Sequence, residues 1–126
     1  MKTGNPEDVA LRFVECINNQ DLKGLVALMT EDHVFIDYGG RVMGKKVMVE
    51  EGWPGYFSQY PEYRIHISKI TRSGNDIALI GTTTGSHAPP GIEARWTLIW
   101  IARIRDGLVA EWRIYSDIDH IRERIP

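Results

Sequence analysis

The spacing of apolar residues changes once along this chain, near Glu62, and the change sets the order of helices and strands. Before Glu62, apolar residues mostly recur with helical spacing, apart from the alternating segment at 32–38. After Glu62 the period is two, which is the period of strands. Turn-forming residues divide this second part into four expected strands: 63–71, 76–87, 94–105 and 109–116. Helices followed by a run of strands indicate an α+β fold, with the helices on one face of a curved, mostly antiparallel sheet.

The helical part begins with a strong start signal. Asn5 can cap a helix, Pro6 suits its first position, and the acidic residues that follow favour the positive end of the helix dipole. We expect this helix to run to Asn18. A second helix is expected over 22–29, and a third over 45–51 is expected to break or kink, because a proline and two glycines follow it.

One expected strand is apolar on both faces. In WTLIWIARI, at 96–104, tryptophan and leucine alternate with threonine and isoleucine. Such a strand belongs in the centre of a sheet that is covered on both sides. The helices provide one cover. We expect a second copy of the chain to provide the other, as a homodimer through the outer face of the sheet.

Composition narrows the class of protein. The chain has 126 residues, of which 43% are hydrophobic and 25% charged, so it can bury a core, and we expect one domain over 1–126. The formal net charge of −2 provides no electrostatic footprint for nucleic acid or an anionic membrane, so neither is an expected partner. Cys16 is the only cysteine, and we find no signal peptide and no apolar stretch of about 20 residues, so we expect a cytoplasmic protein.

Several segments resemble a known superfamily. RFVECINNQDLKGLVALMTEDHVFIDYGG, at 12–40, is similar to the opening of nuclear transport factor 2-like proteins. WPGYFSQYPEYRI, at 53–65, resembles their passage from the third helix into the sheet. GTTTGSHAPPGIEA and IRDGLVAEWRIYSD resemble the last strands of SnoaL-like members. The resemblance covers nearly the whole chain and is closest to SnoaL-like polyketide cyclases and ketosteroid isomerase-like proteins.

This resemblance implies a cone, in which a strongly bent sheet wraps around three helices and encloses an apolar pocket open at one end. It also implies dimerisation through the outer face of the sheet, which is common in this superfamily. For activity it is unspecific, because the same pattern serves isomerases, cyclases, dehydratases, hydrolases and proteins without known catalysis. An apolar small molecule is the expected ligand, and no cofactor is expected, since the chain carries no nucleotide, flavin or haem motif.

Asp37 ends the alternating segment and is the first candidate for chemistry. Aligned on the superfamily pattern NxxDLxGxVALxxxD, it falls at the general base of ketosteroid isomerase, which works beside an oxyanion hole of a tyrosine and a protonated aspartic acid. The tyrosine position is Phe13 here, and the second acid falls at or next to Trp100, so both donors are lost and steroid isomerisation is rejected as the first interpretation. A turn role stays open, because an aspartate before the Tyr-Gly-Gly sequence at 38–40 can bind backbone amides two residues on.

Asp117 and His87 are further candidates for acid-base chemistry. Asp117 matches the acid of the family's final motif, which reads EWRIYSD here, although it can also cap a final helical turn. His87 ends an expected strand where a pocket rim is expected, and histidine titrates near neutrality. A surface or structural role is the alternative for His87. No metal is predicted, because the sequence has no HxxxH motif or carboxylate cluster.

Seven aromatic residues are the expected ligand contacts: Phe13, Phe35, Trp53, Tyr56, Phe57, Trp96 and Trp100. For any single one of them, ordinary core packing is the alternative. Together they favour a narrow aromatic pocket for a flat, apolar ligand with one or two oxygens.

Three functions stay open from the sequence. The first is an enzyme that moves a proton or activates water without a cofactor, with Asp37 as its base, on a polyketide-like, terpenoid or similar carbonyl or epoxide compound. The second is a binding protein that uses the same cavity without chemistry. The third is an assembly module in which the sheet face forms a dimer and the pocket is incidental.

Overall fold

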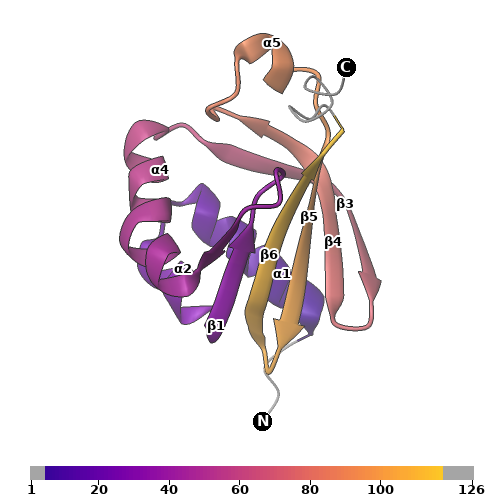
Figure 1. Ribbon diagram of the computed structural model, residues 1–126. Helices are drawn as coiled ribbons and strands as arrows, with labels where there is room; N and C mark the ends of the chain where they lie inside the picture. Colours follow the sequence, from indigo (N-terminus) through magenta and orange to yellow (C-terminus); the bar gives the residue numbers. More distant parts are fainter. Residues whose placement is uncertain (1–4, 118–126) are drawn as a thin grey trace.

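The computed structural model describes residues 5–117, which form one six-stranded sheet with helices packed against it (Figure 1). The helices are α1 (Pro6–Asn18), α2 (Leu22–Ala27), α3 (Lys45–Val47), the π-helical segment η1 (Met48–Gly52), α4 (Trp53–Gln59) and α5 (Pro90–Glu93). The strands are β1 (Met29–Ile36), β2 (Val42–Gly44), β3 (Arg64–Ser73), β4 (Asp76–Thr84), β5 (Leu98–Arg105) and β6 (Leu108–Ser116). The predicted α+β fold class is confirmed.

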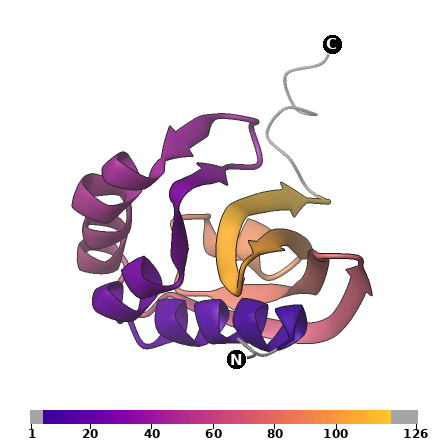
Figure 2. The ribbon, with the colours of Figure 1, turned by 90° about the horizontal axis from the view of Figure 1, so that it is seen from below.

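The sheet is curled, and its strand order is more than a meander. The order is β2-β1-β6-β5-β4-β3, so the first strand lies beside the last one. The β1–β6 pair is parallel, whereas the other pairs are antiparallel. The expected run of consecutive antiparallel strands is therefore right for β3 to β6 and wrong for β1, which joins the sheet through a long-range pairing. Figure 2 shows the sheet curling, with α1 running across it.

β5 lies between β4 and β6, as its doubly apolar sequence predicted. Trp100 and Leu98 face the helices and are buried, whereas Ile99 faces the other side of the sheet and is 36% exposed. Ile99 is paired with Ile80 of β4 and with Tyr115 of β6. The strand therefore has an apolar side chain on its uncovered face as well.

α1 begins where the sequence predicted. The side chain of Asn5 accepts a hydrogen bond from the backbone N–H of Asp8 at 2.8 Å, which satisfies one of the unpaired amides at the helix start. Val9, Phe13 and Ile17 form the inner stripe of the helix and have no exposed surface. Each side chain of this kind contributes about 1.5 to 3 kcal/mol when fully buried, so α1 is fixed by its packing against the sheet.

Two helix boundaries differ from the prediction. α2 ends at Ala27, so the helix expected over 22–29 is too long; Met29 instead pairs with Val109 of β6, and the strand pairing prevails over helical propensity. The break expected after the third helix takes the form of η1, and α4 continues through Pro54. A proline is tolerated there because it lies in the first turn of α4.

Two short elements were not predicted, β2 and α5. α5 lies inside the loop at 85–97, so the strand expected over 94–105 begins only at Leu98. The backbone N–H of Trp96 donates to the carbonyl of Ile92, which continues the helical turn and excludes a strand there. The final helix expected after 117 lies outside the described residues. Among residues 5–117, the structure contains no helix with the length and apolar character needed to cross a membrane.

Candidate functional site

A cavity of about 600 Å³ lies between the inner face of the sheet, α4 and two loops, the turn at 37–41 and the loop at 85–97. Figure 1 shows both loops toward the same end of the sheet. The volume falls within the range of about 300 to 1,000 Å³ that is usual for small-molecule sites. Five of the seven aromatic residues predicted as ligand contacts line the cavity: Phe35, Trp53, Tyr56, Trp96 and Trp100.

Phe13 and Phe57, the other two predicted ligand contacts, do not line the cavity. Phe13 is fully buried and packs against Trp112 with ring centroids 4.7 Å apart. Phe57 is buried beside Trp53, with ring centroids 5.5 Å apart. Helical geometry explains both positions, because α1 and α4 direct these side chains into the core, while Tyr56, the neighbour of Phe57, faces the cavity.

Asp37 follows β1 and has the turn role that the sequence left open. Its Oδ1 accepts hydrogen bonds from the backbone N–H groups of Gly39 and Arg41, each at 2.9 Å. Its Oδ2 lies 3.7 Å from Nε of Arg41. Asp37 also lines the cavity, with 28% of its side chain exposed. The turn interpretation is confirmed, and the carboxylate nevertheless stands at the cavity wall.

His87 lies at the same wall, between two tyrosine side chains. Its Nε2 is 3.0 Å from Oη of Tyr38, and its Nδ1 is 2.8 Å from Oη of Tyr56. The Tyr38 and His87 rings are nearly parallel, with an interplanar angle of 6°. A neutral imidazole carries its proton on only one nitrogen, so one tyrosine donates to the ring while the other accepts from it. The arrangement therefore couples the protons of three side chains that line one cavity.

Burial keeps these tyrosines protonated. Desolvation raises the pKa of Tyr56 from the ordinary 10.0 to about 12. The pKa of Tyr38 is also raised, first by burial and then by the negative charge of Asp37. Phenols that keep their protons at neutral pH are hydrogen-bond donors for a carbonyl, enolate or phenolate oxygen. The cavity wall thus holds donors beside a histidine that can exchange a proton with them.

Asp117 is not brought together with Asp37 and His87. It is exposed at the end of β6 and does not line the cavity. Its Oδ1 accepts the backbone N–H of Thr97 at 2.7 Å, and its own backbone N–H donates to the Thr97 carbonyl at 3.1 Å. These bonds extend the β5–β6 ladder by one step, so the Asp117 carboxylate has a structural role at the end of the strand. The alternative of a cap on a final helix lies outside the described residues.

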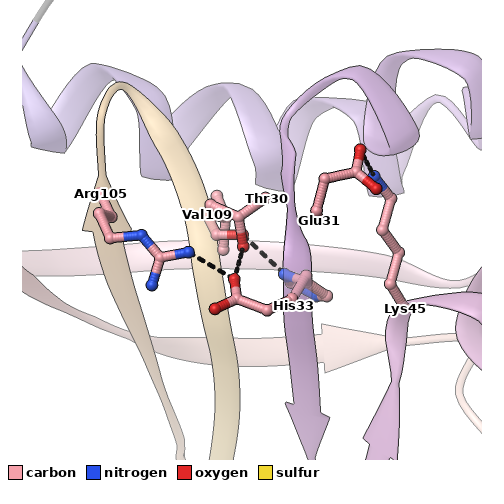
Figure 3. Close-up of polar contacts among 7 residues, drawn as sticks. Thr30, Glu31, His33, Lys45, Arg105 and Val109 are labelled. Atoms are coloured by element: carbon pink, nitrogen blue, oxygen red, sulfur yellow. Dashed lines mark hydrogen bonds and ion pairs between the residues drawn. The ribbon is translucent and has the colours of Figure 1, made fainter.

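The buried histidine of β1 lies away from the cavity. His33 is 1% exposed, and its Nδ1 donates to the carbonyl of Val109 at 2.7 Å, across the β1–β6 pair (Figure 3). Burial lowers the pKa of His33, although the hydrogen bond to Val109 acts in the opposite direction. The ring is therefore neutral at neutral pH. Within residues 5–117, no three histidine, cysteine, aspartate or glutamate side chains are grouped as metal ligands would be.

Most of the tyrosines at the site are not among the residues predicted from the sequence. Tyr38, Tyr60 and Tyr63 line the cavity together with Tyr56. In a continuing strand Tyr38 and Asp37 would lie on opposite faces, but β1 ends at Ile36 and the turn brings both side chains to the cavity. Tyr60 lies four residues after Tyr56, which is one helical turn, and this spacing was a usable signal.

The chain belongs to the SnoaL-like family. The family model of the SnoaL-like domain matches residues 10–112, which include both loops and all the strands up to the middle of β6. The resemblance read from the sequence is therefore confirmed. No functionally curated protein sequence matches the chain.

Solved structures show the same fold. The candidate polyketide cyclase IdmH from Streptomyces antibioticus superposes with a TM-score of 0.74 at 22% identity, covering 90% of this chain and 93% of that one. A cystatin-like protein of unknown function from Xanthomonas campestris has a TM-score of 0.76 at 18% identity, with 95% of each chain covered. A candidate ketosteroid isomerase from Kribbella flavida has a TM-score of 0.70 at 14% identity, covering 91% of this chain and 79% of that one. At these identities the likeness extends to the fold alone.

Proposed function

We propose that the protein binds a flat, apolar small molecule with carbonyl or phenol oxygens and transfers a proton on it with its own side chains. One observation carries the proposal: His87 is bonded through both ring nitrogens to tyrosines that line an aromatic cavity. Membership in the SnoaL-like family supports the same class of ligand, as do the structural neighbours of this chain that are candidate polyketide cyclases.

The chemistry follows from the groups at the wall. Both ring nitrogens of His87 are hydrogen-bonded to tyrosines, so the tyrosine that donates to the ring must first turn its hydroxyl to the carbonyl oxygen of the ligand, which frees that nitrogen. His87 then takes a proton from a carbon next to the carbonyl, and the electron pair moves to the carbonyl oxygen, which becomes an enolate. A tyrosine hydroxyl, Tyr38 or Tyr56, stabilises this oxygen by hydrogen bonding, and the proton then returns from the imidazolium to another carbon of the ligand. Phe13 and Trp100 occupy the positions of the two oxyanion-hole donors of ketosteroid isomerase. In this proposal, the tyrosine hydroxyls provide the hydrogen-bond donor instead.

Asp37 is the second base within the site. Its Oδ1 is occupied by two backbone amides and its Oδ2 lies near Arg41, so the turn already uses the carboxylate. His87 has hydrogen-bond partners that can themselves exchange protons with it. We therefore assign the proton transfer to His87 and keep Asp37 as the competing base, which experiment can separate.

The buried indoles add a further reason to expect an oxygenated ligand. Among the described residues, the Nε1 atoms of Trp53 and Trp100 have no hydrogen-bond acceptor, and both side chains line the cavity. An unpaired buried donor costs roughly 1 to 3 kcal/mol. A ligand oxygen that reached either indole would recover part of this cost.

Binding is tested with 1,8-dihydroxyanthraquinone, a flat coloured molecule with carbonyl and phenol oxygens. A ligand of this size gains about 0.3 kcal/mol per heavy atom, which for ~18 heavy atoms gives a Kd of about 100 μM. The Tyr56→Phe variant should bind more weakly, because it loses a donor at the cavity wall. Spectrophotometric titration that shows no saturable binding by the wild-type protein would contradict the proposal.

Proton transfer is tested with 5-nitrobenzisoxazole, a flat apolar probe. A base removes the proton from its carbon 3, the N–O bond breaks, and coloured 2-cyano-4-nitrophenolate is released. We expect His87→Gln to lower kcat/KM by about 10²-fold or more, which is the usual contribution of a general base. The matched control is His66→Gln, because His66 is exposed, does not line the cavity, and has its Nε2 2.9 Å from Thr84 Oγ1.

Asp37→Asn separates the two bases, because asparagine keeps an acceptor for the turn and removes the basic carboxylate. We expect this variant to retain most of the wild-type rate. A variant series in which Asp37→Asn loses turnover and His87→Gln keeps it would assign the base to Asp37 instead. Saturable ligand binding, together with a rate of 5-nitrobenzisoxazole conversion no higher than in buffer alone, would indicate a binding protein without catalysis.

We also propose that the protein forms a homodimer through the outer face of the sheet. Ile99 and Tyr115 are neighbours on this face and are 36% and 46% exposed, which supports an apolar interface. Ile99→Asp should convert the dimer to a monomer in sedimentation velocity experiments. Leu11→Asp is the matched control, because Leu11 is 42% exposed but lies on α1. A monomeric wild-type protein, or an Ile99→Asp variant that stays dimeric, would contradict this interface.

A further inference from the structure

The segment that carries His87 is held by side chains and not by secondary structure. It lies between the end of β4 and the start of α5. Three consecutive backbone N–H groups donate to side-chain oxygens: Ser86 to Glu93 Oε2 at 3.0 Å, His87 to Tyr56 Oη at 3.1 Å, and Ala88 to Ser86 Oγ at 3.2 Å. The backbone position of His87 therefore depends on what holds these acceptors in place.

Glu93 is the acceptor that ties this segment to the sheet. Its Oε2 accepts the Thr83 hydroxyl at 2.7 Å as well as the Ser86 amide. Thr83 Oγ1 in turn accepts the indole N–H of Trp96 at 3.2 Å, and both Thr83 and Trp96 are buried. One carboxylate oxygen thus joins β4, the His87 segment and α5, and the chain of bonds ends on a tryptophan of the cavity wall.

Charge and burial make this link a strong one. Hydrogen bonds to a carboxylate are shorter and stronger than neutral ones, and the 2.7 Å distance to Thr83 is in the range of such bonds. Without the carboxylate, the Thr83 hydroxyl and the Ser86 amide both lose their acceptor in a partly buried place. The segment would then relax, and the His87 ring would leave its position between the two tyrosines.

We infer that Glu93 is a positioning residue, which sets the place of the His87 ring relative to Tyr38 and Tyr56 without touching the ligand itself. The expected effect of Glu93 on turnover rests on the proposed function. The expected effect of Glu93 on the position of the His87 ring can be measured without any turnover. Glu93 does not line the cavity, which separates its role from that of the residues at the wall.

Three variants of Glu93 distinguish positioning from general stability. Glu93→Gln keeps one oxygen where Oε2 now accepts both bonds, so it should preserve the geometry and most of the activity. Glu93→Asp withdraws the acceptor by one methylene, and Glu93→Ala removes it. Glu15→Ala is the matched control, because Glu15 is an exposed glutamate on α1.

The first readout is the nitrogen-15 NMR spectrum of the His87 ring, which reports its tautomer and its hydrogen bonds. We expect Glu93→Gln to give the wild-type ring signals, and Glu93→Asp and Glu93→Ala to shift them. The second readout is turnover of 5-nitrobenzisoxazole. Displacement of a catalytic group by about 1 Å costs up to about 10²-fold, so kcat should fall by about 10- to 100-fold for Glu93→Ala while KM changes little.

The outcomes separate this inference from the proposed function. Shifted His87 signals in a series without turnover would uphold the positioning role and reject the catalysis. Active Glu93→Ala and Glu93→Asp variants with wild-type His87 signals would overturn the positioning role and leave the catalysis intact. If Glu93→Ala does not fold, the His87 signals and kcat of Glu93→Asp test the positioning role instead. An equal fall in kcat for Glu93→Gln and Glu93→Asp would also overturn the inference.

Discussion

The two ends of this fold use similar side chains in opposite ways. At the packed end, the Phe13 ring lies beside those of Trp112 and His33, with ring centroids 4.7 and 5.9 Å away, and all three side chains are buried. At the cavity end, Tyr56 and His87 stand at the wall of a space of about 600 Å³. Each end has a histidine with aromatic neighbours and a hydrogen-bonded ring nitrogen. Close packing fixes the first, and side-chain hydrogen bonds fix the second.

This difference explains how a small domain keeps a cavity without losing its fold. Contacts at the packed end stabilise the fold, because each atom buried in a closely packed interior adds hydrophobic and dispersion energy. The cavity end forgoes part of that stabilisation. It compensates with polar links within its two loops and from one of them to β4, such as those of Asp37 and Glu93, which hold the wall in place while the space stays open. Substitutions should therefore affect stability at the packed end and activity at the cavity end.

The largest expected effect is that of Phe13→Ala at the packed end. Removing a fully buried phenylalanine should lower the free energy of unfolding by about 3 to 5 kcal/mol, because the cavity left behind cannot close. Phe35→Ala is the comparison at the cavity end. Phe35 is only half-buried and borders empty space, so the loss should be about half as large. Urea-induced unfolding measures both values.

Equal losses for the two variants would contradict the distinction between the ends. Binding of 1,8-dihydroxyanthraquinone provides the complementary measurement. Phe35→Ala should weaken binding, whereas Phe13→Ala should leave the affinity of the remaining folded protein unchanged. If the Phe13→Ala variant is fully folded and still binds the ligand more weakly, the packed end also shapes the cavity.

The next largest effect is a pH dependence that belongs to the packed end. Burial lowers the pKa of His33, so the unfolded chain binds a proton that the folded ring does not. The contribution of His33 to the free energy of unfolding is fully present above the pKa of the unfolded chain, about 6.5. It is lost as the pH falls below this value, by at most about 1.4 kcal/mol per pH unit. The neighbouring charges are Lys45, which adds to the lowering, and Asp32, which opposes it.

His33→Gln tests this expectation, because glutamine can still donate to the Val109 carbonyl but does not titrate. The free energy of unfolding of this variant should vary less than that of the wild-type protein between pH 7 and pH 5. His66→Gln is the control and should keep the wild-type dependence, because His66 is exposed. A wild-type stability that stays constant or rises as pH falls over this interval would show that His33 is not the buried neutral base described here.

The fold was predictable where local signals and long-range pairing agree. The Asn5 cap, the end of α1 at Asn18 and the central place of β5 were all evident from spacing and turn residues. The parallel pairing of β1 with β6 was not, because nothing within either strand encodes the partner or its direction. Met29 shows the same effect, since a helical pattern was overridden by pairing with a strand that lies far along the chain.

The candidate site was predictable only in part, because a cavity is a property of how elements meet. The aromatic character of the wall was evident, and Asp37 and His87 both line the cavity. The contact of His87 with Tyr38 joins residues 49 positions apart, and Tyr38 reaches the cavity because the chain turns after Ile36. Asp117 is a candidate acid from the sequence, but its carboxylate contacts the backbone of Thr97 and does not line the cavity.

The smallest expected effect lies at the cavity end, in the turn that Asp37 caps. Asp37→Ala removes the acceptor of two backbone amides and should lower the free energy of unfolding by about 1 kcal/mol, because these amides are exposed enough to bind water instead. Asp37→Asn keeps an acceptor and loses only the exposed ion pair with Arg41, so its loss should be at most about 0.5 kcal/mol. Urea-induced unfolding of both variants separates the cap from the charge. Equal losses would show that the charge and not the cap stabilises the turn. A loss as large as that of Phe13→Ala would mean that polar links hold the fold as strongly as packing does, and the contrast between the two ends would no longer stand.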